Sequence, residues 1–241
     1  MKQYKKDFID FLLEAQALKF GEFVTKSGRN TPFFINLGCF NDGEQLQKLG
    51  GFYAEAIKEN FGDSMDVLFG PAYKGIPIAT ATAIALWDKF GIKTKYCSNR
   101  KEIKDHGDTG IFLGNKLASG DKIVIVEDVT TAGTSVYETM DMVKDLGVQV
   151  LGLVVSVDRM ERGKTEKSAI SELSSVFSFK GTAIVTMAEV VEYLSQKVVD
   201  GKPVLDDEKI AKIKPHGLQH ARPPCPSPTP RVYSNSCPLS Q

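Results

Sequence analysis

The sequence predicts an α/β fold in which helices flank a central, mostly parallel sheet, with a small N-terminal cap. Apolar, β-branched runs such as 122–126 and 148–157 indicate strands that are buried on both faces. Segments with apolar residues at helical spacing separate these runs, and strands that alternate with helices form parallel sheets through right-handed crossovers. Ligands of such sheets bind beyond the carboxyl ends of the strands, so we expect the functional residues there.

The elements follow in order from the spacing of apolar residues and from turn residues. Phe8, Phe11 and Leu12 begin an amphipathic helix, and the two short strands after it enclose a polar turn. The polar, aperiodic segment 100–114 is expected to be an irregular loop. Gly147 is expected to end the helix over 133–145. The expected helices are 3–18, 46–61, 76–89, 133–145, 167–174 and 187–196. The expected strands are 22–24, 33–37, 67–69, 94–97, 122–126, 148–157 and 182–185.

Composition limits the functional class. With 42% hydrophobic and 25% charged residues, the chain has an ordinary globular composition, which excludes a disordered chain or a multi-span membrane protein. A formal net charge of zero argues against a protein that grips nucleic acid. There is no apolar signal core, and Cys39 and Cys97 show no C-x-x-C spacing. We therefore expect reduced thiols, a cytoplasmic location and no membrane association.

The last 27 residues differ from the rest. They hold seven of the 11 prolines, two arginines and no acidic residue, which leaves residues 1–214 with a net charge of −2. Pro-rich sequence of this kind is not expected to fold alone. We therefore assign 1–214 as the functional domain, with a cap at about 1–40, and 215–241 as a disordered or non-native tail without a catalytic role.

The strongest functional signal is segment 124–135, Val-Ile-Val-Glu-Asp-Val-Thr-Thr-Ala-Gly-Thr-Ser. An apolar strand ends in Glu127 and Asp128, and a Thr/Gly/Ser loop then opens a helix. Backbone N–H groups, hydroxyls and a helix N-terminus bind a phosphate dianion, whereas carboxylates suit sugar hydroxyls or a shared divalent cation. The order describes a ribose-5-phosphate site. Helix caps at an ordinary junction would explain one or two of these residues, not the whole run, and neither a Walker A nor a G-x-G-x-x-G motif is present.

This run resembles the phosphoribosyl diphosphate (PRPP) binding motif of the type I phosphoribosyltransferases, which transfer ribose-5-phosphate to a nitrogen nucleophile. A second segment, 99–107 (Asn-Arg-Lys-Glu-Ile-Lys-Asp-His-Gly), carries four potentially cationic side chains. Most charge runs are solvated surface, but this one follows a strand end and holds the only histidine of residues 1–214. A mobile loop here could close over a departing diphosphate. The segment resembles the catalytic loop of orotate phosphoribosyltransferases.

Two further segments fit the same family, so that the resemblance covers about residues 1–214. Segment 25–36 resembles its base-binding segment, in which Lys26 would contact PRPP or the base and Phe34 and Ile35 would form an apolar wall for a pyrimidine ring. Segment 70–77 (Gly-Pro-Ala-Tyr-Lys-Gly-Ile-Pro) resembles its diphosphate loop. One departure is that the acidic pair reads Glu-Asp where many members have Asp-Asp.

A last segment, Val-Asp-Arg-Met-Glu-Arg-Gly at 157–163, follows a buried strand. Its Arg159 resembles the family residue that pairs with the substrate carboxylate, for which a planar guanidinium is the expected donor. The resemblance implies these catalytic residues: Arg100, Lys101, Lys104, His106 and Asp128. It implies these PRPP contacts: Lys26, Tyr73, Lys74, Arg100, Lys101, Lys104, His106, Glu127, Asp128, Val129, Thr130, Thr131, Ala132, Gly133, Thr134 and Ser135. It implies these orotate contacts: Lys26, Phe34, Ile35, Thr131 and Arg159.

The function that the resemblance implies is transfer of ribose-5-phosphate from PRPP to orotate, giving orotidine 5′-monophosphate and diphosphate in pyrimidine (UMP) biosynthesis. Mg²⁺ is expected as cofactor, held mainly through PRPP with help from Glu127 and Asp128 and without a strong direct protein ligand. The family also implies a homodimer in which the catalytic loop is shared between subunits.

Two alternatives remain open at this point. A purine phosphoribosyltransferase would share segment 127–135, and a PRPP-fold regulatory protein would bind without turnover. The regulatory protein would have lost the catalytic loop and would carry a basic face. In this sequence the loop is intact, and residues 1–214 have a net charge of −2. A fused decarboxylase is not expected, because the tail is too short for a barrel of about 250 residues.

Overall fold

The protein is described by a computed structural model that covers residues 1–24, 30–104, 110–161, 167–199 and 202–217. The helices are α1 (Gln3–Glu14), η1 (Leu37–Cys39), α2 (Gly43–Phe61), α3 (Gly75–Phe90), α4 (Thr134–Val143), α5 (Ala169–Phe177), α6 (Met187–Gln196) and α7 (Asp207–Gly217). The strands are β1 (Leu18–Val24), β2 (Asn30–Ile35), β3 (Val67–Phe69), β4 (Lys95–Lys104), β5 (Gly110–Gly114), β6 (Lys122–Glu127), β7 (Gln149–Asp158), β8 (Lys180–Thr186), β9 (Val198–Val199) and β10 (Lys202–Pro203).

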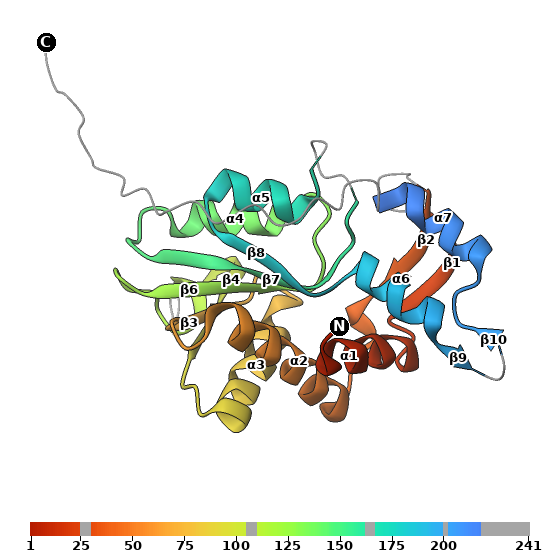
Figure 1. The fold of residues 1–241 in the computed structure, drawn as a ribbon. Coiled ribbons are helices and arrows are strands. Elements are labelled where there is room, and N and C mark those ends of the chain that lie inside the picture. Colours follow the sequence, from red (N-terminus) through yellow and green to blue (C-terminus); the bar gives the residue numbers. More distant parts are fainter. Residues whose placement is uncertain (25–29, 105–109, 162–166, 200–201, 218–241) are drawn as a thin grey trace, which may run out of the picture.

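The central sheet has the strand order β5-β4-β3-β6-β7-β8. Its strands pair in parallel, except that β5 runs antiparallel to β4. Helices α4 and α5 cover one face of the sheet, and α2 and α3 cover the other (Figure 1). The predicted α/β class and mostly parallel sheet are confirmed. None of the helices in the described ranges combines the length and the hydrophobicity that a bilayer span requires.

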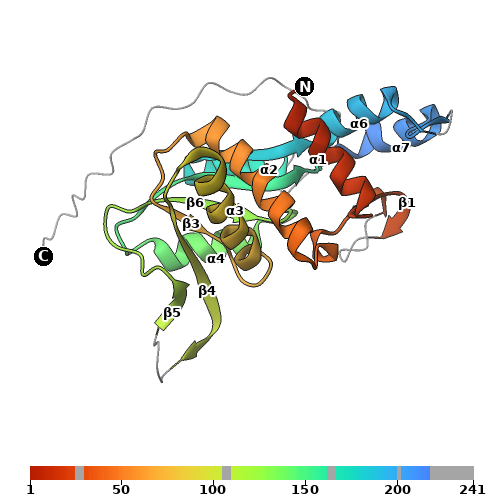
Figure 2. The same cartoon turned by 90° about the horizontal axis from the view of Figure 1, so that it is seen from below.

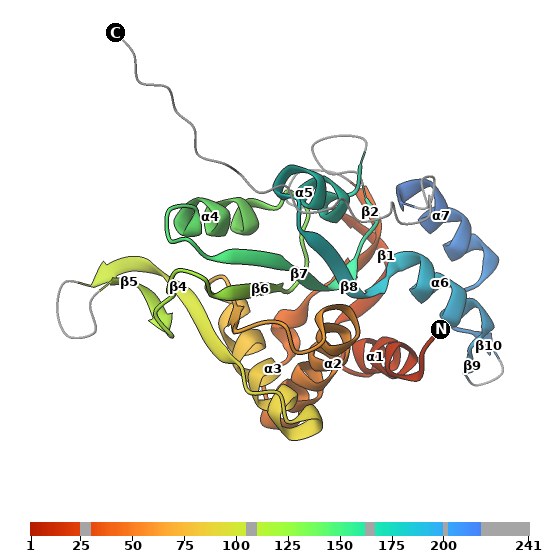
Figure 3. The same cartoon turned by 60° about the vertical axis from the view of Figure 1, so that its left-hand side comes forward.

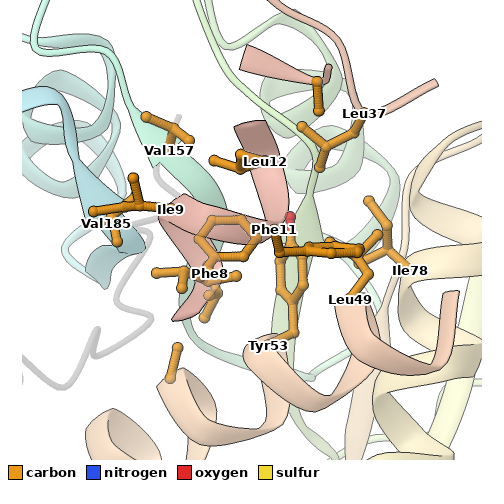
Figure 4. Close-up of a cluster of buried hydrophobic side chains, with 14 of the residues drawn as sticks. Phe8, Ile9, Phe11, Leu12, Leu37, Leu49, Tyr53, Ile78, Val157 and Val185 are labelled. Carbon is orange, nitrogen blue, oxygen red and sulfur yellow. The ribbon is translucent and has the colours of Figure 1, made fainter. Parts of the chain in front are cut away.

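The larger core cluster joins α1 to the sheet and to α2 (Figure 4). Its labelled members are Phe8, Ile9, Phe11, Leu12, Leu37, Leu49, Tyr53, Ile78, Val157 and Val185. The helix predicted over 3–18 was too long, because α1 ends at Glu14 and Leu18 already begins β1. Gln16 lies between them with a φ of 53°, a left-handed conformation that ends a helix.

The N-terminal cap consists of an antiparallel hairpin, β1–β2, in which Leu18 lies opposite Ile35. The hairpin is separate from the central sheet, and α7 packs against β2 from the far end of the chain (Figure 1). Helix α7 reaches Gly217, three residues past the boundary assigned at Lys214. Residues 218–241 lie outside the described ranges, so the inert tail stays a prediction.

The segment 100–114 was expected to be an irregular loop, but its described parts, 100–104 and 110–114, belong to the strands of a β-hairpin. Strand β4 continues to Lys104, and Cys97–Asn99 pairs antiparallel with Phe112–Gly114 of β5. The hairpin projects from the body of the molecule (Figures 2 and 3). Because Lys101 and Glu102, among the described residues of the arms, are exposed, backbone pairing forms the arms without the apolar alternation that sequence patterns detect.

Candidate active site

The end of β6 leads directly into the loop that the sequence assigns to phosphate. Strand β6 ends at Glu127, and α4 begins at Thr134 after a turn in which Gly133 has a φ of 71°. A side chain at Gly133 would be strained, and its Cβ would lie 2.8 Å from Leu173 Cδ2. No side chain caps the N-terminus of α4 within the described residues. The first turn of this helix therefore directs its N–H groups toward the loop, as an anion site requires.

Hydroxyl groups from α2 and β7 hold the backbone of the acidic pair. The Tyr53 hydroxyl of α2 donates to the Glu127 carbonyl at 2.7 Å, and the Ser156 hydroxyl of β7 donates to the Asp128 carbonyl at 2.5 Å. The Val129 N–H donates to Asp128 Oδ1 at 2.6 Å, which also fixes that carboxylate. Both acidic residues are buried. Two carboxylates are thus anchored at the carboxyl end of β6 through their own backbone, which is held by a helix on one side and a strand on the other.

Burial raises the pKa of Glu127 to about 7, with the Asp128 charge adding to the effect and a hydrogen bond from Ser135 opposing it. Burial also raises the pKa of Tyr53 well above its ordinary value, helped by the charges of Asp128 and Glu127. Tyr53 therefore remains a hydrogen-bond donor at neutral pH.

The raised pKa of Glu127 predicts a pH-dependent stability. Unfolded Glu127 ionises near its ordinary value of 4.5, so the folded state binds more protons between 4.5 and about 7. The contribution of Glu127 to the free energy of unfolding is therefore fully present below 4.5 and is lost as the pH rises through about 7. Urea unfolding at pH 5 and pH 8 measures it. Glu127→Gln should show a smaller loss of stability than the wild type, whereas Glu192→Gln, at an exposed position of α6, should not. Identical pH dependence in all three proteins would contradict the prediction.

The loop between β3 and α3 lies against this acidic pair. Gly70 and Gly75 approach closely, since a Cβ atom on Gly75 would lie 2.6 Å from the Gly70 carbonyl carbon. The Ala72 N–H donates to Asn99 Oδ1 at 2.8 Å, which ties the loop to β4. Lys74 Nζ lies 2.6 Å from Asp128 Oδ2. Two segments that are 54 residues apart in the sequence therefore meet at one point.

The cations of the hairpin have contacts of their own. Lys101 Nζ lies 3.1 Å from Glu138 Oε2 of α4, an ion pair between exposed side chains. Arg100 Nε donates to the Phe112 carbonyl at 3.3 Å. Only the backbone of Lys104, at the end of β4, is described, and His106 lies outside the described residues. An exposed ion pair contributes little stability, so Lys101 can exchange Glu138 for another anion at small cost.

Arg159 lies just after β7, beneath the N-terminal cap. Its guanidinium lies over the Phe33 ring at 4.6 Å, and the residue is 8% exposed. Arg159 Nε donates to Glu161 Oε2 at 3.1 Å and Nη2 donates to Glu161 Oε1 at 2.9 Å. The guanidinium is thus placed for bidentate carboxylate recognition, which in this structure is satisfied by Glu161.

Comparison with known proteins supports one family. A sequence model of the phosphoribosyl transferase domain matches residues 39–189. The chain is 60% identical over 221 residues to the orotate phosphoribosyltransferase of Clostridium beijerinckii. The aligned region covers 91% of this chain and 99% of that protein. The chain belongs to the orotate phosphoribosyltransferase family. It is therefore a transferase of pyrimidine biosynthesis. This finding sets aside both alternatives, the purine phosphoribosyltransferase and the regulatory protein.

Solved structures agree with this family. The orotate phosphoribosyltransferase of Francisella tularensis has a TM-score of 0.75 at 38% identity, and the match covers 87% of this chain and 96% of that one. The Mycobacterium tuberculosis orotate phosphoribosyltransferase, solved in complex with 5-phospho-α-D-ribosyl 1-diphosphate, has a TM-score of 0.57 at 18% identity, covering 78% of this chain and 98% of that one. The second likeness concerns the fold alone.

One part of the predicted orotate site needs correction. Successive residues of a strand point to opposite faces, so Phe34 is 45% exposed whereas Ile35 is buried in the core. The two side chains therefore do not form one wall, as the sequence suggested, and Arg159 packs on Phe33, which shares the face of Ile35. Lys26 lies outside the described residues. Thr131 is exposed in the loop before α4, and Tyr73 is 71% exposed beside Lys74.

Four residues that shape the site were not predicted from the sequence. Tyr53 belongs to a helical apolar pattern and was expected only to pack, and Asn99 and Ser156 belong to strands. No sequence signal marks their hydrogen bonds, because each bond joins separate elements. Glu161 is different, since its position two residues after Arg159 places an acid within reach of that guanidinium.

Proposed function

We propose that PRPP binds across the carboxyl ends of β3, β4, β6 and β7, with orotate placed beneath the cap. The observation that carries this proposal is the 2.6 Å contact between Lys74 Nζ and Asp128 Oδ2. It joins the predicted diphosphate loop to the predicted ribose-phosphate loop, as a ligand with a phosphate at each end of a ribose requires. The chain transfers ribose-5-phosphate from PRPP to orotate, giving orotidine 5′-monophosphate and diphosphate.

The ribose and its 5′-phosphate are assigned to different groups of one segment. The N-terminus of α4 and loop residues Val129–Ser135 receive the phosphate dianion, because they offer N–H groups and hydroxyls without a nearby negative side chain of their own. Glu127 and Asp128 accept hydrogen bonds from the ribose hydroxyls. Their anchored backbone keeps the carboxylates in place as positive charge develops on the sugar.

The leaving diphosphate is assigned to cations. Lys74 reaches it from the loop before α3, and Arg100 and Lys101 reach it from the hairpin, with Lys104 and His106 as further predicted contacts. In the reaction the bond from C1′ to the diphosphate oxygen breaks and a bond from C1′ to the orotate nitrogen forms, through an oxocarbenium-like transition state. The cations stabilise the negative charge that appears on the diphosphate. The orotate nitrogen gives up its proton as the bond to C1′ forms, and the departing diphosphate is itself a base that accepts it, so no strong general base of the protein is needed.

Mg²⁺ is proposed as the cofactor. Among the described residues no group of three or more His, Cys, Asp or Glu is arranged to hold a metal ion. The carboxylates of Glu127 and Asp128 supply oxygen donors suited to Mg²⁺, and Asp128 also contacts Lys74. This donor set fits an ion held mainly through PRPP. When bound to the diphosphate and the ribose hydroxyls, such an ion would neutralise negative charge on the leaving diphosphate.

Orotate is assigned to the cap side of the site. Arg159 would receive its carboxylate, and Phe34 and Thr131 would contact the ring, with Lys26 as a further predicted contact. A PRPP-dependent assay with orotate, adenine and hypoxanthine tests the assignment at equal concentrations. We expect orotate to be the only one of the three bases that releases diphosphate from PRPP. Turnover of a purine base without turnover of orotate would contradict the assignment.

A homodimer and a cytoplasmic location are also proposed. Ile84 and Trp87 lie three residues apart on α3 and are 57% and 59% exposed, an apolar pair suited to burial against a second copy. The hairpin of β4 and β5 projects from its own subunit (Figure 3), which favours a site shared between subunits. The unpaired thiols of Cys39 and Cys97 fit a reducing compartment.

The shared site predicts complementation between subunits. A Lys101→Ala subunit lacks a hairpin cation and an Asp128→Asn subunit lacks a core carboxylate. Random mixing after mild dissociation makes half of the dimers mixed, each with one intact site, so activity should recover to about a quarter of the wild-type value. The fluorescence of Trp87, the only tryptophan in the chain, follows dissociation. A mixture as inactive as either variant, despite exchange of subunits, would mean that each subunit uses its own hairpin.

A further inference from the structure

Glu161 forms a bidentate contact with the Nε–Nη2 edge of the Arg159 guanidinium. Its two oxygens accept from Nε and Nη2 at 3.1 Å and 2.9 Å, and the two side chains are 8% and 10% exposed. The second hydrogen of Nη2 is directed at the Thr31 hydroxyl at 3.4 Å. That hydroxyl also lies 3.3 Å from Glu161 Oε1 and 3.1 Å from the Phe33 carbonyl. The pair is therefore enclosed between β2 and the end of β7.

A second carboxylate has no complete edge of the guanidinium available. A bidentate contact needs two N–H groups that point the same way. With both hydrogens of Nη2 engaged, Nη1 is left as the donor without a partner in the described ranges. A substrate carboxylate that takes the Nε–Nη2 edge of Arg159 must therefore displace Glu161, whereas the Nη1–Nη2 edge would require it to displace the Thr31 hydroxyl and to lie beside the negative charge of Glu161.

The energetics favour such an exchange. A buried guanidinium without a counter-charge is strongly destabilising, whereas swapping one carboxylate for another keeps the charge of Arg159 paired and requires only that the displaced Glu161 carboxylate be solvated. The internal partner also weakens the binding of substrate, because the apparent dissociation constant rises as the fraction of Arg159 that is available falls. The same competition acts on the product, which retains the carboxylate.

We infer that Glu161 is an internal carboxylate that pairs Arg159 between turnovers and exchanges with the carboxylate of orotate and of orotidine 5′-monophosphate. This inference rests on the proposed contact between Arg159 and orotate. Glu161 thereby sets the affinity for substrate and product through Arg159. In the empty site it pairs with the charge of Arg159, and after the reaction it promotes release of the product.

The test compares the wild type with Glu161→Gln, which keeps the shape of the side chain and removes its charge. We expect the KM for orotate to fall about tenfold, with a similar fall in the dissociation constant of orotidine 5′-monophosphate measured by calorimetry. The KM for PRPP should not change. Glu161→Asp, whose shorter side chain weakens the two-point contact, should give a smaller fall. Glu192→Gln is the matched control on an exposed surface and should change neither constant.

Two results would overturn the inference. If Glu161→Gln folds normally and the KM for orotate is unchanged, the carboxylates do not compete. If that KM rises, Glu161 only orients Arg159. A parallel Arg159→Gln variant separates this failure from failure of the proposed function, since an unchanged KM in that variant would remove Arg159 from the orotate site altogether. In the Arg159→Gln background, Glu161→Gln should have no further effect on the KM for orotate.

Discussion

Replacing Lys101 by alanine is expected to lower kcat about 100-fold while changing the KM for orotate much less. The reason is that Lys101 lies on the projecting hairpin, where its ion pair with Glu138 at 3.1 Å is exposed and can be exchanged readily. A cation that meets the diphosphate only as it leaves stabilises the transition state more than the bound substrates. Steady-state kinetics with varied orotate at saturating PRPP measures the two parameters separately.

Two controls make the Lys101 result specific. Lys48→Ala removes an exposed lysine whose ion pair with Glu44 resembles the Lys101–Glu138 pair, and it should leave kcat unchanged. Glu138→Gln removes the partner of Lys101 but keeps the cation, and it should not lower kcat. If Lys101→Ala had a normal kcat, the hairpin cation would have no part in catalysis, and the proposal for the leaving group would be wrong for this residue.

Replacing Asp128 by asparagine is expected to lower kcat/KM for PRPP about 100-fold. Asparagine keeps an oxygen that can accept from the Val129 N–H, so the local backbone should survive. What is lost is the charge that pairs with Lys74 at 2.6 Å and that accepts from the ribose. Because the lost charge acts on the sugar, the KM for orotate should change less than the parameter for PRPP.

The matched control for Asp128→Asn is Asp141→Asn on α4. It removes an exposed aspartate that pairs with Lys144 at 2.7 Å, and it should leave kcat/KM for PRPP at the wild-type value. Thermal unfolding followed by circular dichroism establishes that both variants are folded. Equal activity of the two folded variants would contradict the ribose assignment of Asp128.

The phosphate and ribose parts of the candidate site could be predicted because they are contiguous. Strand β6, the acidic pair, the loop with Gly133 and the start of α4 follow one another within a single segment, and each step has its own local physical cause. The sequence of a buried strand, two carboxylates and a loop of small polar residues thus specifies both structure and chemistry.

The hairpin and the cap show where such reasoning ended. The polar arms of β4 and β5 are held by pairing between strands, which no local periodicity records. The resemblance to a family identified Phe34 and Ile35 together, but the alternation of β2 divides them between surface and core. Lys26 and His106 lie outside the described ranges, so their roles stay predictions.

By itself the sequence determined the α/β class, the order of most elements and the segment that forms the phosphate cradle, because these depend on burial patterns and neighbours along the chain. Only the tertiary structure decided that Lys74 meets Asp128, that Asn99 holds the loop before α3, and that Glu161 fills the carboxylate site of Arg159 over Phe33. Those contacts depend on strand order and on which side chains remain unsatisfied once the core has packed, and neither quantity is carried by any single segment.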